Sequence, residues 1–232
     1  MANFKSRRPS APGWRLVWED DFEGDAIDPK RWRIEDAALV KNDELQYYCP
    51  EEVILGGSCV TLRSRRRVKG GRPYTSGLIE SRDRFSQEYG RFEVRAQLPR
   101  GQGLWPAHWM LPSNGDWPPE IDIMESLGHA PRTVLMTVHW RSARGPRHHT
   151  ERFRGPDYSR GFHTFEIEWG PRELIWRIDG VERFRKRERV PRSPFYLILN
   201  TAVGGMLPGN PNGSTRFPQY HRIDWVRVWK RV

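Results

Sequence analysis

Apolar and polar residues alternate with a period of two in short runs along the chain, and turns rich in glycine and proline separate the runs. Alternation of this kind places successive side chains on opposite faces of a β-strand, so each run predicts one strand. No segment has the period of a substantial amphipathic helix. The predicted strands are Trp14–Trp18, Val53–Leu55, Cys59–Leu62, Gly77–Arg82, Arg91–Leu98, Trp105–Leu111, Glu120–Glu125, Val134–Trp140, Phe162–Trp169, Leu174–Ile178, Val181–Arg185, Phe195–Asn200 and Ile223–Trp229.

Two turn sequences join neighbouring runs into predicted hairpins. Gly56-Gly57 lies between two strands, and Asp179-Gly180 favours a type I′ turn between two others. A dozen or so antiparallel strands without a helix predict two packed sheets, and a jelly-roll sandwich is the economical arrangement. No internal repeat or low-complexity linker divides the 232 residues. We therefore expect a flexible N-terminal segment, 1–12, followed by a single domain, 13–232.

The formal net charge of +10 comes mainly from arginine. Such an excess could attract nucleic acid or a sulfated polysaccharide, or it could reflect a compositional preference for arginine on exposed strands. The basic residues are scattered, with local runs only at Arg63–Arg67 and Arg183–Arg189, and this favours the second interpretation. No apolar run approaches transmembrane length, so no membrane partner is expected.

The first residues, Met1–Arg8, are basic but lack an apolar stretch behind them, so the sequence gives no sign of a signal peptide. A secreted protein whose leader had been removed would look the same. The two cysteines, Cys49 and Cys59, are expected to be free, because a turn at Gly56-Gly57 places Cys59 opposite Ile54.

Three carboxylates stand within six residues at Glu120, Asp122 and Glu125. Strict alternation would place Glu125 on the face opposite to the other two, but a β-bulge within Ile123–Met124 would return it to the same face. Clustered acids repel one another and separate their pKa values, so that one ionises while another keeps its proton. The alternative is an ordinary solvated strand face.

Trp105 and Trp109 lie four residues apart on a predicted strand, with the small Ala107 between them. Both indoles would lie on one face and could form a floor on which sugar rings stack. The alternative is that both are core residues. Beside three acids on a neighbouring strand, we favour a sugar-binding cleft.

The segments Gly103–Pro112 and Glu120–Glu125 resemble glycoside hydrolase family 16, and within it the laminarinase-like endo-β-1,3-glucanases. Similar family segments are Asn42–Tyr48, Tyr74–Gly77, Phe195–Gly205 with Pro208–Pro211, and Ile223–Trp229, so that the resemblance spans residues 14–230. It implies a curved jelly-roll sandwich with an open cleft on its concave face. One departure is Pro119, where these enzymes usually carry glycine.

By matching positions, the resemblance assigns Glu120 as nucleophile and Glu125 as general acid/base of a retaining hydrolase, with Asp122 orienting Glu120. Further substrate-binding candidates are His139, expected near Glu125, and Asn42, with Glu44 beside it; Trp117 and Arg82 complete the set. His148 and His149 resemble a metal pair, but they are expected in an Arg/Gly/Pro-rich loop without a third ligand.

Members of the family often carry a structural calcium ion on the convex side. The matching positions here are Glu23 or Gly24, Gly57 and Asp224, and the ion would stabilise the fold without taking part in catalysis.

The sequence therefore predicts an endo-acting retaining hydrolase of β-1,3-glucan, with mixed-linkage β-1,3-1,4-glucan as a further substrate. We expect it to be monomeric and secreted, with no nucleic-acid partner. Two alternatives stay open. One is a hydrolase of a galactan, agarose or carrageenan, and the other is a catalytically silent glucan-binding module.

Overall fold

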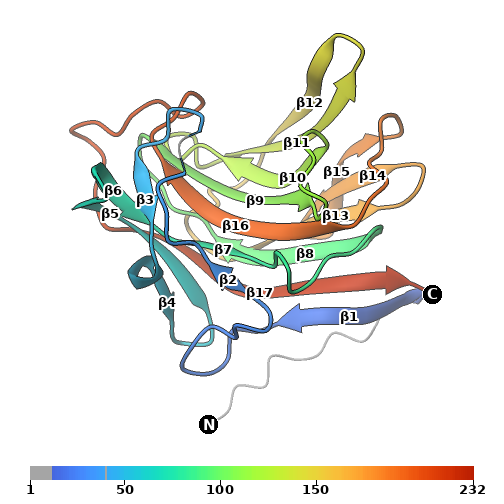
Figure 1. Ribbon diagram of the computed structural model, residues 1–232, viewed down its shortest axis with the longest axis horizontal. Coiled ribbons are helices and arrows are strands. Elements are labelled where there is room, and N and C mark those ends of the chain that lie inside the picture. Colours follow the sequence, from blue (N-terminus) through green and yellow to red (C-terminus); the bar gives the residue numbers. More distant parts are fainter. Residues whose placement is uncertain (1–11, 40) are drawn as a thin grey trace.

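The computed structural model describes residues 12–39 and 41–232, and the strands in this part of the chain form two large sheets (Figure 1). Residues 1–11, nearly all of the predicted flexible segment 1–12, lie outside the described residues, so that prediction is untested. The expected all-β jelly-roll sandwich is confirmed. A single turn of 3-10 helix, η1 (Pro50–Glu52), is the only helix in the described ranges.

The first sheet contains ten strands and lies on the side of the sandwich away from the cleft described below. Eight strands follow one path, while β1 pairs with β17 and β4 pairs with β5. Along the path the order is β15 (Val181–Lys186), β14 (Leu174–Ile178), β13 (His163–Trp169), β8 (Gly90–Gln97), β17 (Gln219–Arg231), β5 (Val60–Lys69), β6 (Arg72–Ser76) and β3 (Gln46–Tyr48), with β1 (Trp14–Asp20) and β4 (Val53–Leu55) beside it.

The second sheet contains seven strands, which curve strongly across the molecule (Figure 1). The long hairpin of β11 and β12 rises at one end of this sheet, and the segment around β3 rises at the other. Its order is β12 (Gly145–Arg154), β11 (Thr133–Ser142), β10 (Glu120–Ser126), β9 (Leu104–Pro112), β16 (Phe195–Val203), β7 (Leu78–Glu80) and β2 (Arg33–Ile34).

The core lies between the two sheets and is built from alternate residues of their strands. Phe92 and Val94 of β8 contribute from one sheet, and Met110, Ile121 and Leu197 contribute from β9, β10 and β16 of the other. All five are almost completely buried. Because alternate residues enter the core, their neighbours on β9 and β10 are directed to the opposite, solvent-facing side of the sheet. That face carries the candidate site.

Two features of the fold differ from the sequence-based expectation. The segment with His148 and His149 is the strand β12 and not a loop, and most of its residues are exposed because it forms the edge of the sheet. One pair of strands, β3 and β6, is parallel, whereas only antiparallel pairs were expected. The remaining predicted strands are present, with ends shifted by a few residues.

The turn between β4 and β5 is shifted by one residue from its predicted position. Gly57 and Ser58, both with positive φ, occupy the turn, and Gly56 pairs with Cys59. Positive φ at both central residues is the conformation of a type I′ turn. The hairpin was therefore predicted correctly, but the expected pairing of Cys59 with Ile54 was wrong. Both cysteines are free, as expected.

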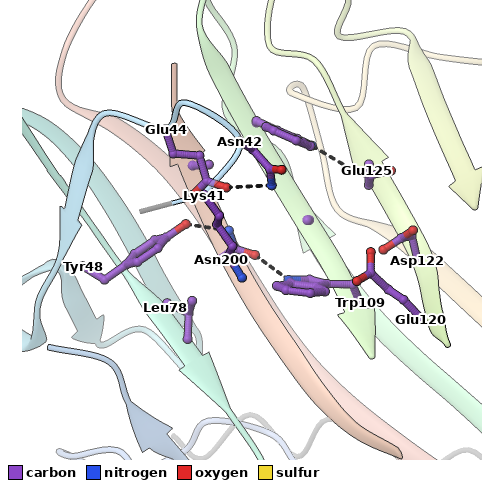
Figure 2. Close-up of a pocket in the computed structure, with 13 residues that line it drawn as sticks. Lys41, Asn42, Glu44, Tyr48, Leu78, Trp109, Glu120, Asp122, Glu125 and Asn200 are labelled. Atoms are coloured by element: carbon purple, nitrogen blue, oxygen red, sulfur yellow. Dashed lines mark hydrogen bonds between the residues drawn. The ribbon is translucent and has the colours of Figure 1, made fainter. Parts of the chain in front are cut away.

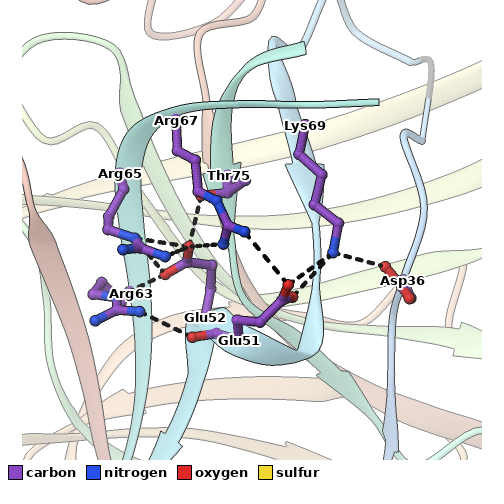
Figure 3. A network of polar contacts seen from close by, with 8 residues as sticks. All are labelled: Asp36, Glu51, Glu52, Arg63, Arg65, Arg67, Lys69 and Thr75. Carbon is purple, nitrogen blue, oxygen red and sulfur yellow. Dashed lines mark hydrogen bonds and ion pairs between the residues drawn. The ribbon is translucent and has the colours of Figure 1, made fainter. Parts of the chain in front are cut away.

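Glu52, at the end of η1, is a completely buried acid that ties β5 and β6 together (Figure 3). Its carboxylate accepts hydrogen bonds from Arg63 Nε (2.7 Å), Arg65 Nη2 (2.6 Å) and Thr75 Oγ1 (2.7 Å). Burial alone would raise the pKa of Glu52, but the bonds from Arg65, Thr75 and Arg63 outweigh burial and lower it. The network holds β6, which pairs with β3, and β3 directly follows the segment that borders the cleft.

Candidate active site

A β-bulge in β10 brings the three acids to one face of the sheet. On β9, Asp122 faces Trp109 whereas Glu125 faces Ala107, and the register shifts between Asp122 and Met124. The register with β11 shifts over the same residues. One extra residue in a strand reverses the alternation beyond it. The predicted bulge is confirmed, and Glu125 shares its face with Glu120 and Asp122.

The acids line a cleft together with both predicted indoles (Figure 2). Trp105, Ala107 and Trp109 alternate along β9, as the sequence predicted, and all three border this cleft. The opposite wall comes from β16, β7 and the segment before β3. The complete lining is Lys41, Asn42, Glu44, Tyr48, Leu78, Trp105, Ala107, Trp109, Glu120, Asp122, Glu125, Asn200 and Ala202.

Glu125 is placed to hold a proton near neutral pH. Burial raises the pKa of Glu125 to about 7, and the negative charge of Glu120 adds to this effect. Trp105 Nε1 donates to Glu125 Oε1 at 2.9 Å and Thr137 Oγ1 donates to Oε2 at 3.4 Å, and both bonds favour the ionised form. The result is a carboxyl group that can both give and take a proton.

Glu120 and Asp122 ionise in the reverse of the usual order. On a protein surface an aspartate normally has a lower pKa than a glutamate, but here Asp122 holds its proton more tightly. Asp122 is only 3 % exposed, and burial together with the charges of Glu120 and Glu125 raises its pKa well above the usual range. Burial also raises the pKa of Glu120, but hydrogen bonds from Trp117 and Asp122 and the charge of Lys41 oppose the increase. Asp122 therefore keeps its proton and shares it with an ionised Glu120.

His139 was expected beside Glu125, but it lies beside Glu120 and Asp122. Its Nε2 is 3.4 Å from Glu120 Oε1 and 3.2 Å from Asp122 Oδ2. The cross-strand register explains the difference, because β11 places His139 opposite Glu120 and Leu135 opposite Glu125. Burial lowers the pKa of His139 to about 4, so the ring is neutral at working pH.

The two indoles of the floor are fixed by hydrogen bonds at their edges. Trp109 Nε1 donates to Asn200 Oδ1 at 2.8 Å, and Asn200 in turn donates to Tyr48 Oη at 2.8 Å. The ammonium group of Lys41 lies 4.7 Å from the centre of the Trp109 ring. Indoles held at their edges keep their faces in a fixed orientation, which suits stacking against a ring.

The other predicted substrate contacts fall into two groups. Asn42 borders the cleft and donates to Glu44 Oε1 at 3.2 Å. Trp117 is 50 % exposed beside the cleft and donates from Nε1 to Glu120 Oε2 at 2.9 Å. Arg82 is not part of the cleft lining, since its exposed guanidinium lies over the ring of Tyr196, 5.7 Å from its centre. Tyr196 packs in one cluster with Leu78 and Trp109 of the cleft, so the role of Arg82 in substrate binding stays a prediction.

Sequence reasoning missed Lys41, Tyr48, Asn200 and Thr137. The polar Asn200 within the mainly apolar strand β16 was a usable signal, because a buried amide requires partners. Thr137 could have been found from its place two residues before His139 on one strand face. No local pattern distinguished Lys41 from the many other basic residues.

The predicted calcium site at Glu23, Gly57 and Asp224 stays a prediction. The carboxylate of Asp224 forms an ion pair with the guanidinium of Arg95, which brings a positive charge to the oxygen that would bind the ion. Glu23 and Gly57 are both exposed. Within the described residues, one triplet of acid and histidine side chains has ligand atoms within 4.8 Å of one another, namely Glu120, Asp122 and His139. Asp122 shares its proton with Glu120, and the indole of Trp117 donates to Glu120. These contacts account for the cluster without a metal ion.

The curved sandwich, the separated proton affinities of Glu120 and Glu125 and the indoles beside them define the class of glycoside hydrolases that act through two carboxyl groups. Residues 34–227 match the family Glycosyl hydrolases family 16. The chain belongs to this family.

Relatives with known names support the assignment. The chain is 38% identical to "Beta-glucanase" of Rhodothermus marinus, over 97% of this chain and 88% of that protein. It is 31% identical to "Glucan endo-1,3-beta-glucosidase A1" of Niallia circulans over 96% of its length, but it spans only 39% of that longer protein. Among solved structures, the laminarinase catalytic domain of Thermotoga maritima superposes with a TM-score of 0.87 at 37% identity, covering 94% of this chain and 99% of that one.

Proposed function

We propose that this protein is an endo-acting retaining hydrolase of β-1,3-glucan that also accepts mixed-linkage β-1,3-1,4-glucan. The observation that carries the proposal is the bulge in β10, which places Glu120 and Glu125 on one face with opposite protonation states. The floor of Trp105 and Trp109 beside them suits a chain of sugar rings. The activities named for the relatives point to glucan.

The geometry supports a double displacement in which the two acids have separate roles. Glu125 gives its proton to the glycosidic oxygen, and the ionised Glu120 attacks the anomeric carbon as the bond to that oxygen breaks. The covalent glycosyl-enzyme is then attacked by water, which Glu125, now ionised, deprotonates. Glu120 leaves as a carboxylate, and Glu125 regains its proton.

Asp122 and His139 serve the nucleophile in this mechanism without touching the leaving group. The proton that Asp122 shares with Glu120 orients the carboxylate and stabilises its charge. His139 is neutral and fills the space behind both groups without adding a positive charge. A cation at that position would weaken Glu120 as a nucleophile.

A galactan hydrolase is the second candidate, and the net charge of +10 favours it because carrageenan carries sulfate groups. A silent glucan-binding module is less well supported, since all three acids are present and their protonation states are separated. Within the described residues no helix is long and apolar enough to cross a membrane. The monomeric state and secretion stay predictions.

Incubation with laminarin, lichenan, agarose and carrageenan, followed by measurement of new reducing ends, separates these functions. We expect release from laminarin and lichenan, with an early fall in polymer length that indicates internal cleavage. Proton NMR of the first products should show the β-anomer, because double displacement retains configuration. Release from carrageenan alone would assign the galactan function, and no release with retained binding would assign the binding module.

A further inference from the structure

Trp117 occupies an unusual position for a residue that is half exposed, because three separate contacts hold it in place. Its indole Nε1 donates to Glu120 Oε2 at 2.9 Å. Its backbone carbonyl accepts a hydrogen bond from Arg141 Nη2 at 2.5 Å. Its ring lies against His139, with centres 6.2 Å apart and a tilt of 44°. The loop before β10 is thus fixed to β11 at the point where it meets Glu120.

We propose that Trp117, anchored by Arg141, is a positioning residue for Glu120: its indole N–H holds the carboxylate in the attacking orientation. The role rests on the proposed function, in which Glu120 is the nucleophile. It differs from that of a cleft wall, which would act on the substrate and not on the nucleophile.

The residues between Trp117 and Glu120 explain why a side chain supplies this hydrogen bond. Both are proline, Pro118 and Pro119, and proline has no backbone N–H. The two positions immediately before Glu120 therefore cannot donate to its carboxylate. With no backbone donor at either position, the indole N–H of Trp117 supplies a hydrogen bond to the carboxylate from the same loop.

The charged groups that face Glu120 leave the indole as its leading stabilising contact. Asp122 and Glu125 are acids on its own strand, His139 is neutral, and Lys41 contributes a positive charge from across the cleft. Burial raises the pKa of Glu120, and the hydrogen bond from Trp117 is the largest effect that lowers it, ahead of Lys41. A buried carboxylate without such a donor would bind a proton more readily.

A second indole serves Glu125 in the same manner, since Trp105 Nε1 donates to Glu125 Oε1 at 2.9 Å. The two tryptophans come from different elements, and each contacts one acid. The variants W117F and W105F should therefore affect opposite limbs of the pH profile, which separates a positioning role from a general disturbance of the cleft.

The first experiment measures the pH dependence of laminarin hydrolysis by W117F, which removes the indole N–H but keeps an aromatic ring. We expect kcat to fall about 10- to 100-fold, with KM changed less than about threefold, because the lost bond serves the nucleophile. The acid limb should move up by about one pH unit, since Glu120 then ionises at higher pH. R141K should show a smaller shift in the same direction.

The matched control is W140F, since Trp140 lies one residue from His139 but on the opposite face of β11. It should leave kcat and the acid limb unchanged. Circular dichroism and Tm establish that each variant is folded. An increase in KM for W117F with kcat and the acid limb unchanged would overturn the proposal and leave Trp117 as a cleft wall.

NMR of 15N-indole groups provides a readout that does not depend on activity. The Trp117 resonance, identified by its loss in W117F, should titrate with Glu120 in the wild type and should lose that titration in E120Q. Titration that persists in E120Q would overturn the proposal. A wild type that hydrolyses no glucan but shows the titration would refute the proposed function and retain the contact.

Discussion

Glu52 and Asp122 are both buried acids at strand ends or bulges of the same sandwich, yet their protonation states are opposite. Glu52 is 0% exposed and its pKa is lowered, because Arg65, Thr75 and Arg63 donate to it. Asp122 is 3 % exposed and its pKa is raised well above the usual range, because burial is reinforced by the charges of Glu120 and Glu125. Burial is common to both sites, and the charge of the neighbours differs.

The comparison separates an acid that stabilises the fold from acids that can do chemistry. The carboxylate of Glu52 is surrounded by donors that lower its pKa, so it is ionised at neutral pH and has no proton to transfer there. In β10 the acids face one another, and the protein keeps protons in the cluster that can move when a substrate binds. Burial of an acid alone therefore does not identify a catalytic residue.

The largest expected effect in this comparison comes from E120Q. Removal of the nucleophile should lower kcat on laminarin by about 10⁴-fold or more, because glutamine cannot form the glycosyl-enzyme and Asp122 beside it keeps its proton. Binding of laminari-oligosaccharides, measured by calorimetry, should persist. Undiminished turnover would contradict the assignment of Glu120 as nucleophile.

The next largest effect should be a loss of stability in E52Q. The change leaves Arg63 and Arg65 without their anionic partner, and we expect a loss of about 3 kcal/mol in the free energy of unfolding, near the lower end for a broken buried pair because both arginines reach solvent. Tm should fall by about 6–12 °C. At temperatures well below Tm, kcat should stay close to that of the wild type.

E51Q is the matched control for this variant. Glu51 is adjacent in sequence and pairs with Lys69, but its side chain is exposed. An exposed ion pair contributes little, so the Tm of E51Q should stay close to that of the wild type. Equal losses in E51Q and E52Q would contradict the distinction between the two acids.

One of these two acid sites could be predicted from the sequence, and the other could not. The acids of β10 and their bulge were predictable, because Glu120, Asp122 and Glu125 break an otherwise regular alternation. The Glu52 network was missed, although Arg63, Arg65 and Arg67 are spaced by two and therefore share one strand face. That spacing signalled a common partner, but the partner lies in another element, and only the fold identifies it.

Strands were predictable where apolar and polar residues alternate or a turn sequence marks a hairpin, and they were missed where neither signal is present. β9, β10 and β16 carry apolar residues that enter the core, and the sequence predicted all three. β12 is an edge strand with exposed basic residues, and β3 and β6 are short, so no alternation marked them. The position of His139 beside Glu120 depends on the register of two strands, which a single sequence does not specify.

E125Q should increase stability at high pH, in contrast to E52Q. The pKa of Glu125 is about 7 in the folded protein and about 4.5 when unfolded, so the wild type loses stability as pH rises through this interval. Glutamine does not ionise, and we expect the variant to gain about 2 kcal/mol relative to the wild type between pH 5 and pH 8. Tm measured across this range tests it.

Glu52 has the opposite dependence. Its folded pKa lies below the unfolded value, so its contribution is present above the unfolded pKa and disappears as pH falls through the folded pKa. The Tm difference between E52Q and the wild type should therefore shrink toward low pH. The same trend with pH in both variants would contradict the comparison.

The smallest expected effect is a shift of the basic limb in W105F. Loss of the hydrogen bond from Trp105 Nε1 raises the pKa of Glu125, so the acid stays protonated to higher pH. The basic limb of kcat should move up by about half to one pH unit, while the acid limb stays in place. Steady-state kinetics from pH 4 to pH 10 measure both limbs at once.

The edge strand β12 has a consequence for crowded or concentrated protein. Its outer backbone groups form no ladder with another strand of this sheet, and such a rim is a template on which a second copy could add its own strand. The strand carries the basic residues Arg147, Arg152 and Arg154, two histidines and a single acid, Glu151, all of them exposed, so its net charge is positive. Two such rims repel each other, so the basic composition that first suggested a nucleic-acid partner acts here as a safeguard against aggregation.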